Sequence, residues 1–221
     1  AMDLGDWTPL HSAAHNGNKE AVAALIDAGS AIGATDSGGR TPLHWAARNG
    51  NKETVAALID AGAAVGATDG GGQTPLHWAA GNGNKETVAA LIDGGAAVGA
   101  MDIDGWTPLH AAAGNDRQEA LAALLCEGAD VDGNGSSSVP LKIAADSGHL
   151  GIVSVLIAWG AVVGAVRPSG TRVRFSSKAK QLRSVLDNTP RLSDKERQEA
   201  KDEWRAVVAL TKTAVAVVDP A

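Results

Sequence analysis

The tetrapeptide Thr-Pro-Leu-His occurs four times in this chain of 221 residues, at a constant spacing. It begins at positions 8, 41, 74 and 107, and a degenerate copy, Val-Pro-Leu-Lys, begins at Val139, 32 residues after the last of them. Residues 41–69 and 74–102 differ at only three of 29 positions. Such a period indicates repeated supersecondary units that stack into one array, in which each unit packs on its neighbours.

Each unit is predicted to contain two short helices joined by a tight loop. Pro42 fits the first turn of a helix, where its missing N–H is not needed. Apolar or small residues recur at helical spacing on one face of each helix, first at Leu43, Ala46, Ala47 and Gly50 and then at Val55, Leu58 and Ile59. The stretch 49–51 breaks the first helix, and Gly62 is placed for a left-handed cap of the second.

These features together resemble the ankyrin repeat: the TPLH motif, the Ala-Ala that follows, the glycine between the helices and the 33-residue period. The resemblance covers about residues 3–168. It implies an all-α solenoid of five units, about 4–36, 37–69, 70–102, 103–134 and 135–168, whose helix pairs stack and whose turns project as fingers. The fifth unit has lost the Thr and His of its motif, so we expect it to be a less regular, terminal unit.

Residues 167–221 differ in character from the repeats. They carry 12 Lys and Arg against 7 Asp and Glu, whereas residues 1–166 carry 7 against 18. A break at 168–170 precedes one predicted helix that ends at Asp187, and a capping box of Ser193 and Glu196 starts a second, long helix. We expect this C-terminal helical extension, residues 169–221, to cap the open end of the stack. Self-association, or reaching back along the stack, are the alternatives.

Composition and charge exclude several classes of protein. A net charge of −6 argues against wholesale wrapping by nucleic acid. One cysteine, Cys126, allows no disulfide framework and is compatible with a reducing, intracellular compartment. No apolar run is long enough for a membrane span, and the start, AMDLGDWTPL, has no signal-peptide pattern. We therefore expect an intracellular, cytoplasmic location.

The residues that could carry chemistry do not indicate catalysis. One motif histidine per unit, at His11, His44, His77 and His110, gives rings too far apart to share a metal ion, whose bonds are ~2 Å long. The resemblance implies that these rings form hydrogen bonds within and between turns instead. His15 and His149 are expected to be isolated and exposed. The glycine run 70–72 lacks the strand and the Lys of a phosphate-binding loop. We expect no enzyme activity, no cofactor and no metal.

Tryptophan and arginine supply the candidate binding site. Trp45 lies opposite Leu43 on its helix with Arg48 nearby, and Trp78 repeats the position of Trp45. In the ankyrin family this side faces a concave groove, and aromatic residues and Arg are enriched at binding hot spots. The site is expected to be flanked by residues of the turns and the first unit, namely Trp7, His15, Arg40, Gln73, Ile103 and Trp106. The alternative is that the indoles lie flat and fill gaps between repeats.

The predicted function is a non-catalytic protein-binding module or scaffold that uses the groove and the turn tips. Homo-oligomeric assembly, through the C-terminal helices or the uncapped N-terminal unit, is the alternative. Contact of the basic tail with nucleic acid or another anionic partner is less favoured and would weaken steeply with salt. The acidic residues of the turns either accept turn hydrogen bonds or face a partner with a basic edge; they are Asp36, Asp69, Asp102 and Asp104. Trp159 and Trp204 are predicted to pack at the C-terminal end.

Overall fold

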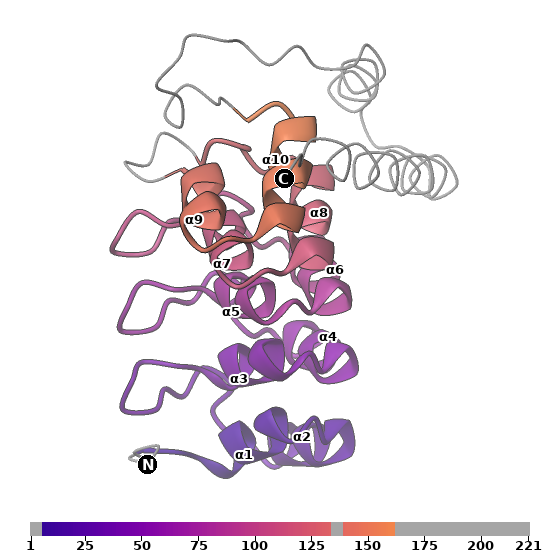
Figure 1. The fold of residues 1–221 in the computed structure, drawn as a ribbon. Coiled ribbons are helices and arrows are strands. Elements are labelled where there is room, and N and C mark those ends of the chain that lie inside the picture. The colour runs from indigo at the N-terminus through magenta and orange to yellow at the C-terminus, as the bar shows by residue number, and fades with distance from the viewer. Residues whose placement is uncertain (1–5, 134–138, 162–221) are drawn as a thin grey trace, which may run out of the picture.

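Five helix pairs stack in consecutive tiers in the computed structural model, which describes residues 6–133 and 139–161 (Figure 1). The inner helices are α1 (Pro9–His15), α3 (Pro42–Asn49), α5 (Pro75–Asn82), α7 (Pro108–Gly114) and α9 (Pro140–Asp146). The outer helices are α2 (Lys19–Asp27), α4 (Lys52–Asp60), α6 (Lys85–Asp93), α8 (Gln118–Cys126) and α10 (Leu150–Ala158). The described residues thus confirm the expected all-α solenoid of helix-loop-helix units.

The loops that enter the inner helices project beyond them on one side of the stack (Figure 1). We call residues 28–41, 61–74 and 94–107 the α3 finger, the α5 finger and the α7 finger, after the helix that each one enters. The predicted C-terminal extension, residues 169–221, lies outside the described residues, and so do the helices and Trp204 assigned to it. The boundaries of the five units stay a prediction, whereas the helix pairs within them are observed.

The TPLH motif builds the start of each regular inner helix. Thr41 has an extended backbone at the N-cap of α3, and Pro42 occupies the first turn, as expected. The Thr41 N–H donates to Nδ1 of His44 at 3.1 Å, which completes a capping box with the threonine side chain. Val139 replaces this threonine before α9 and makes no side-chain cap hydrogen bond. The last inner helix therefore starts less regularly, as the degenerate motif indicates.

Glycines end the helices where the sequence places them. Gly50 is the left-handed C-cap of α3, with φ of 75°, and Gly62 follows α4 with φ of 92°. Only glycine adopts this conformation without a steric cost from Cβ. The tight loop 49–51 and the turn after α4 are therefore both fixed by residue type.

One apolar core runs through all five helix pairs. Leu43, Ala46 and Ala47 of α3 and Val55 and Leu58 of α4 are fully buried. The core continues from Leu10 in the first pair to Leu156 in the last, and Trp159 packs against it as predicted. Because alanine side chains are small, the helices approach closely and each pair is covered by its neighbours, so stability comes from the interfaces between repeats.

The motif histidines connect each repeat to the next. His44 accepts a hydrogen bond at Nδ1 from Thr41 of its own repeat, so its Nε2 carries the proton and donates to the Gln73 carbonyl at 3.0 Å. His11 and His77 make the same bond to the carbonyls of Arg40 and Trp106, both at 2.9 Å. The expectation that these rings bond within and between turns is confirmed.

A second series of hydrogen bonds joins the start of an outer helix to the end of the inner helix in the preceding repeat. Nδ2 of Asn84 donates to the Arg48 carbonyl at 3.0 Å, and Nε of Arg117 donates to the Gly81 carbonyl at 3.3 Å. His149 occupies the equivalent position before α10 and bonds the Gly114 carbonyl through Nε2 at 3.1 Å. The prediction that His149 is isolated and exposed is wrong, because this half-buried ring replaces asparagine in the series.

Candidate functional site

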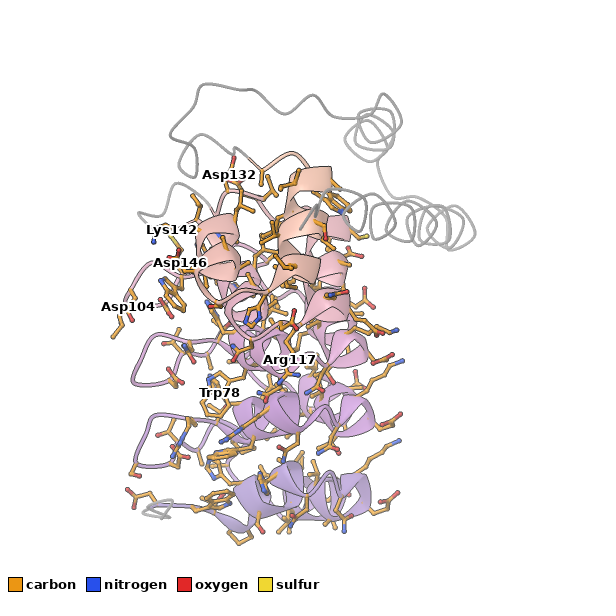
Figure 2. The ribbon with its side chains drawn as sticks, in the orientation of Figure 1. Trp78, Asp104, Arg117, Asp132, Lys142 and Asp146 are labelled. Carbon is orange, nitrogen blue, oxygen red and sulfur yellow. The ribbon has the colours of Figure 1, made fainter. Side chains whose placement is uncertain are left out.

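Aspartates organise the base of each described finger. Oδ1 of Asp36 accepts the backbone N–H groups of Gly38 at 2.9 Å and of Arg40 at 3.0 Å. Asp69 and Asp102 repeat both bonds in the α5 and α7 fingers. This geometry is the turn hydrogen bonding that the sequence offers as one of two interpretations. Asp104 differs, because it stands at the tip of the α7 finger and is exposed (Figure 2).

The same carboxylates hold the two central indoles. Nε1 of Trp45 donates to Oδ2 of Asp36 at 3.0 Å, and Nε1 of Trp78 donates to Oδ2 of Asp69 at the same distance. Trp78 therefore lies on the finger side of α5 (Figure 2). Each indole fixes an inner helix to the finger that precedes it, and both polar ends of the pair are satisfied.

Three indoles form a continuous aromatic row across the first three repeats. Trp7 stacks on Trp45 with ring centroids 4.7 Å apart, and Trp78 meets Trp45 edge to face at 5.6 Å. His15 places its ring edge-on to Trp7 at 5.7 Å and to Trp45 at 5.4 Å. His15 is half-buried in this row and contacts Asn49, so the prediction that it is isolated and exposed is wrong.

Two guanidinium groups cover the aromatic row. The Arg40 guanidinium lies 4.7 Å from the Trp45 ring centroid, and the Arg48 guanidinium lies 5.3 Å from Trp45 and 5.4 Å from Trp78. Cations at such distances are attracted by the ring faces. Arg40 also forms an ion pair with Asp36 at 2.8 Å, whereas the Arg48 guanidinium has no ion pair within the described ranges and lies over the rings.

Asp36 stays ionised in this buried position. Burial by itself raises its pKa, but hydrogen bonds from the Arg40 backbone, the Trp45 indole and the Gly38 backbone, together with the Arg40 charge, outweigh burial. The net result is a pKa below the ordinary value of 3.8. A permanent negative charge therefore anchors both Trp45 and Arg40 at neutral pH.

The family model described as ankyrin repeats (3 copies) matches the chain in three overlapping segments, residues 1–69, 62–135 and 104–166. The chain belongs to the ankyrin-repeat family. Ankyrin repeats are generally protein–protein interaction modules and are typically non-catalytic. No curated protein matches this ankyrin-repeat chain.

The predicted site residues of this ankyrin-repeat protein fall into two groups. Six of them meet in the aromatic row and its cover: Trp7, His15, Arg40, Trp45, Arg48 and Trp78. The other three lie on the α5 and α7 fingers: Gln73, Ile103 and Trp106. Within the second group, Gln73 reaches the next finger, with Nε2 3.4 Å from Oδ2 of Asp102.

Exposure separates the residues that are open to a partner from those that are not. Trp45 is completely buried, so its indole fills the space between repeats, as the alternative interpretation has it. Trp78 and Arg48 are half-buried, and Ile103 and Trp106 are exposed. Binding of a partner by any of these residues stays a prediction.

Sequence reasoning missed two parts of this ankyrin-repeat surface. The first is the pairing of Trp45 and Trp78 with the aspartates nine residues before them, Asp36 and Asp69. The second is Met101, an exposed side chain on the α7 finger where the preceding repeat has Thr68. Aligning consecutive repeats would reveal both features: the Asp–Trp spacing is the same in both cases, and Met101 is a difference from Thr68.

The described part of the ankyrin stack holds no set of three or more His, Cys, Asp or Glu side chains arranged for a metal ion. No helix of this part is long and apolar enough to cross a membrane. Cys126 is half-buried at the last residue of α8. What the site offers chemically is aromatic area, apolar finger residues and the Arg48 guanidinium.

Proposed function

We propose that this ankyrin-repeat chain is a non-catalytic scaffold that binds a protein partner along its fingers and the adjoining aromatic row. The observation that carries the proposal is a concentration of exposed apolar side chains on the α7 finger. Met101, Ile103 and Trp106 are 55%, 76% and 37% exposed within six residues of chain. Exposed apolar groups gathered in this way mark interaction surfaces more often than scattered ones do.

The α7 finger is held firmly enough to present these side chains. The Ile103 N–H donates to the Gly71 carbonyl of the α5 finger at 3.1 Å, and Asp102 accepts the Trp106 N–H at 2.9 Å. The Trp106 ring stacks on His110, with centroids 6.2 Å apart and an interplanar angle of 18°. A preformed apolar surface loses little conformational entropy on binding, which favours affinity.

Capture from a matched cell extract tests this function. The wild type is compared with the double variant Ile103→Ser/Trp106→Ser, and circular dichroism confirms that both are folded. We expect a partner that the wild type retains and the double variant loses. The substitutions are at exposed finger positions, so they leave the helix core intact.

Leu150→Ser is the matched control, because Leu150 is another exposed apolar residue and begins outer helix α10. This variant is expected to retain the partner. Equal capture by the wild type, the double variant and the control would contradict binding through the α7 finger. Trp45 is unsuitable for such a test, because a buried indole contributes to folding as well.

Self-association through the first helix pair is the second candidate. Leu25 of α2 is half-buried, whereas its equivalents Leu58 and Leu91 are completely buried. An apolar helix face that is left open can bind the same face of a second copy. Light scattering of the wild type and of Leu25→Ser tests this assembly. A wild-type dimer that the Leu25→Ser substitution dissociates would support it. A wild type that stays monomeric over a wide concentration range would rule it out.

The assembly role of the C-terminal helices and the anionic-partner role of the basic tail concern residues outside the described part of the molecule. Both stay predictions. A binding signal to nucleic acid or anionic vesicles that falls steeply with salt would support the tail contact.

A further inference from the structure

Three arginines belong to the described residues, and two of them use their guanidinium groups within the fold. Nε of Arg40 donates to both carboxylate oxygens of Asp36, at 3.0 and 2.8 Å. Nε of Arg117 donates to the Gly81 carbonyl at 3.3 Å. Arg48 differs, because its guanidinium makes no hydrogen bond and no ion pair with the described residues. The donor groups of Arg48 are thus available to a ligand.

The Arg48 guanidinium is nevertheless held in place. It lies over Trp45 and Trp78 at 5.3 and 5.4 Å from the ring centroids. Each of these rings is itself fixed by a hydrogen bond to an aspartate, and the Arg48 backbone is fixed by Asn84, which donates to its carbonyl at 3.0 Å. A guanidinium restrained on aromatic faces has lost much of its rotational freedom before a ligand arrives.

We propose that Arg48 binds a carboxylate of the protein partner, from an Asp or Glu side chain or from the partner's carboxyl terminus. The inference rests on the proposed function and names the chemistry of one contact in it. Arginine and carboxylate are complementary because two parallel N–H groups face two oxygens. Arg40 and Asp36 show that a guanidinium can lie on Trp45 and bind a carboxylate at the same time.

The surrounding charge restricts the partner further. The described residues carry 17 Asp and Glu against 7 Lys and Arg. The positions equivalent to Arg48 in the first, third and fourth repeats are His15, Gly81 and Gly114. These repeats therefore carry no arginine or lysine beside Arg48 that would form a row of cations. A segment with several acidic residues would be repelled. A phosphate, with up to two charges, needs more cations than this surface offers. One carboxylate in an otherwise uncharged or basic segment fits best.

Side-chain NMR of the arginine Nε–Hε groups tests this inference on the whole 221-residue chain. The probe is N-acetyl-glutamate amide, and the matched control is N-acetyl-glutamine amide, which has the same shape without the charge. Arg48→Lys identifies the Arg48 signal, and the Arg40 and Arg117 signals are internal references. N-acetyl-alanine forms a further arm, because it presents a C-terminal carboxylate and no acidic side chain.

A saturable shift of the Arg48 signal with the glutamate probe, larger than the shifts of Arg40 and Arg117 and absent with the glutamine control, is the expected result. A larger response to N-acetyl-alanine would assign the carboxylate to the carboxyl terminus of the partner. An Arg48 shift no larger than those of the two references, or an equal shift with the glutamine control, overturns the inference. Arg48 would then only cover the indoles.

The two proposals fail separately. If the Arg48 signal does not respond while Ile103→Ser/Trp106→Ser still loses a captured partner, the carboxylate contact is wrong and the proposed function stands. If Arg48 responds while capture is equal for all variants, partner binding through the α7 finger is wrong and the carboxylate site remains.

Discussion

Trp45 donates its indole N–H to the carboxylate of Asp36, nine residues earlier in the sequence, at 3.0 Å. The bond joins an inner helix to the base of its finger, and Asp36 also accepts two backbone N–H groups of that finger. A tryptophan that the sequence offers as a binding residue is therefore part of the support that holds the finger in position. The binding surface depends on this support, because the fingers present the exposed side chains.

The three finger aspartates are expected to differ in their contribution to stability. Asp36 accepts hydrogen bonds from two backbone N–H groups, the Trp45 indole and Arg40. Asp69 accepts from two backbone N–H groups and the Trp78 indole. Asp102 has two backbone donors and, in place of an indole, a long hydrogen bond of 3.4 Å from Gln73. Asp36→Ala should lower the free energy of unfolding by about 2–3 kcal/mol, since hydrogen bonds to a charged group are the strong ones. Asp69→Ala should cost less and Asp102→Ala least, as measured by urea unfolding. A reversed order would contradict the anchoring role of Asp36.

Trp45→Ala should destabilise the protein much more than Trp106→Ala. Trp45 is completely buried and Trp106 is 37% exposed. Truncation of a fully buried aromatic residue costs about 3–5 kcal/mol, because contacts are lost and a cavity remains. Thermal and urea unfolding of both variants measure the difference. Equal stability of the two variants would show that Trp45 is not part of the core in solution.

Stability is expected to fall as the pH drops below about 6.5. Burial lowers the pKa of His44 and His77, although a hydrogen bond to a neighbouring carbonyl opposes the shift. Between the ordinary value of 6.5 and the lower folded value, the unfolded protein binds more protons than the folded one. The contribution of the neutral rings is therefore complete above pH 6.5 and is lost as the pH falls toward the folded pKa.

Melting temperatures at about pH 7.5 and about pH 5.5 measure this loss. His44→Gln is the control. Its melting temperature should be lower than that of the wild type at both pH values, and the difference between its two melting temperatures should be smaller. Asp36 does not interfere, because its lowered pKa confines its effect to pH values below about 4. An unchanged melting temperature of the wild type would contradict the burial of neutral histidines.

Thr54→Ala should stabilise the fold by about 1 kcal/mol. The Thr54 hydroxyl is buried in α4 without a hydrogen-bond partner among the residues that the structure describes, and Thr87 repeats this in α6. A buried hydroxyl that lacks a partner has a desolvation cost, and alanine has the higher helix propensity. The first and fourth repeats already carry Ala21 and Ala120 at this position.

Thr41→Ala is the matched control for this prediction. Its hydroxyl interacts with Nδ1 of His44 at 2.9 Å, so its removal should destabilise the protein by about 1 kcal/mol. Urea unfolding of both variants tests the contrast in sign. A clear loss of stability in Thr54→Ala would mean that filling space at this position outweighs satisfying the hydroxyl.

Much of the fold could be predicted because the repeat fixes local structure several times over. Thr41, Pro42 and His44 encode a helix start, and Gly50 and Gly62 encode its loop and the end of the second helix. Helix capping and the left-handed glycine conformation each involve residues only a few positions apart, so the sequence pattern alone predicts them. The helical spacing of the apolar residues likewise predicts the buried face of the inner helix.

The candidate site could be predicted only as a set of residues. Position on a helix places Trp45, Arg48 and Trp78 on the side opposite Leu43, but it does not say whether an indole faces solvent or a neighbouring ring. Stacking of Trp7 on Trp45 joins residues of two repeats, and the spacing within one helix contains no information about it. The same holds for His149, whose partner is the carbonyl of Gly114, 35 residues earlier.

The sequence by itself determined the unit, its helices and the array in which they stack, because short-range capping, glycine conformation and apolar periodicity act between residues that are close in sequence. The tertiary structure decided which side chains are available. It buried Trp45, left Ile103 and Trp106 exposed and placed Arg48 over two rings without a hydrogen-bond partner among the described residues. Exposure depends on neighbours about one repeat away in sequence, and only the stacking of the repeats brings those neighbours together.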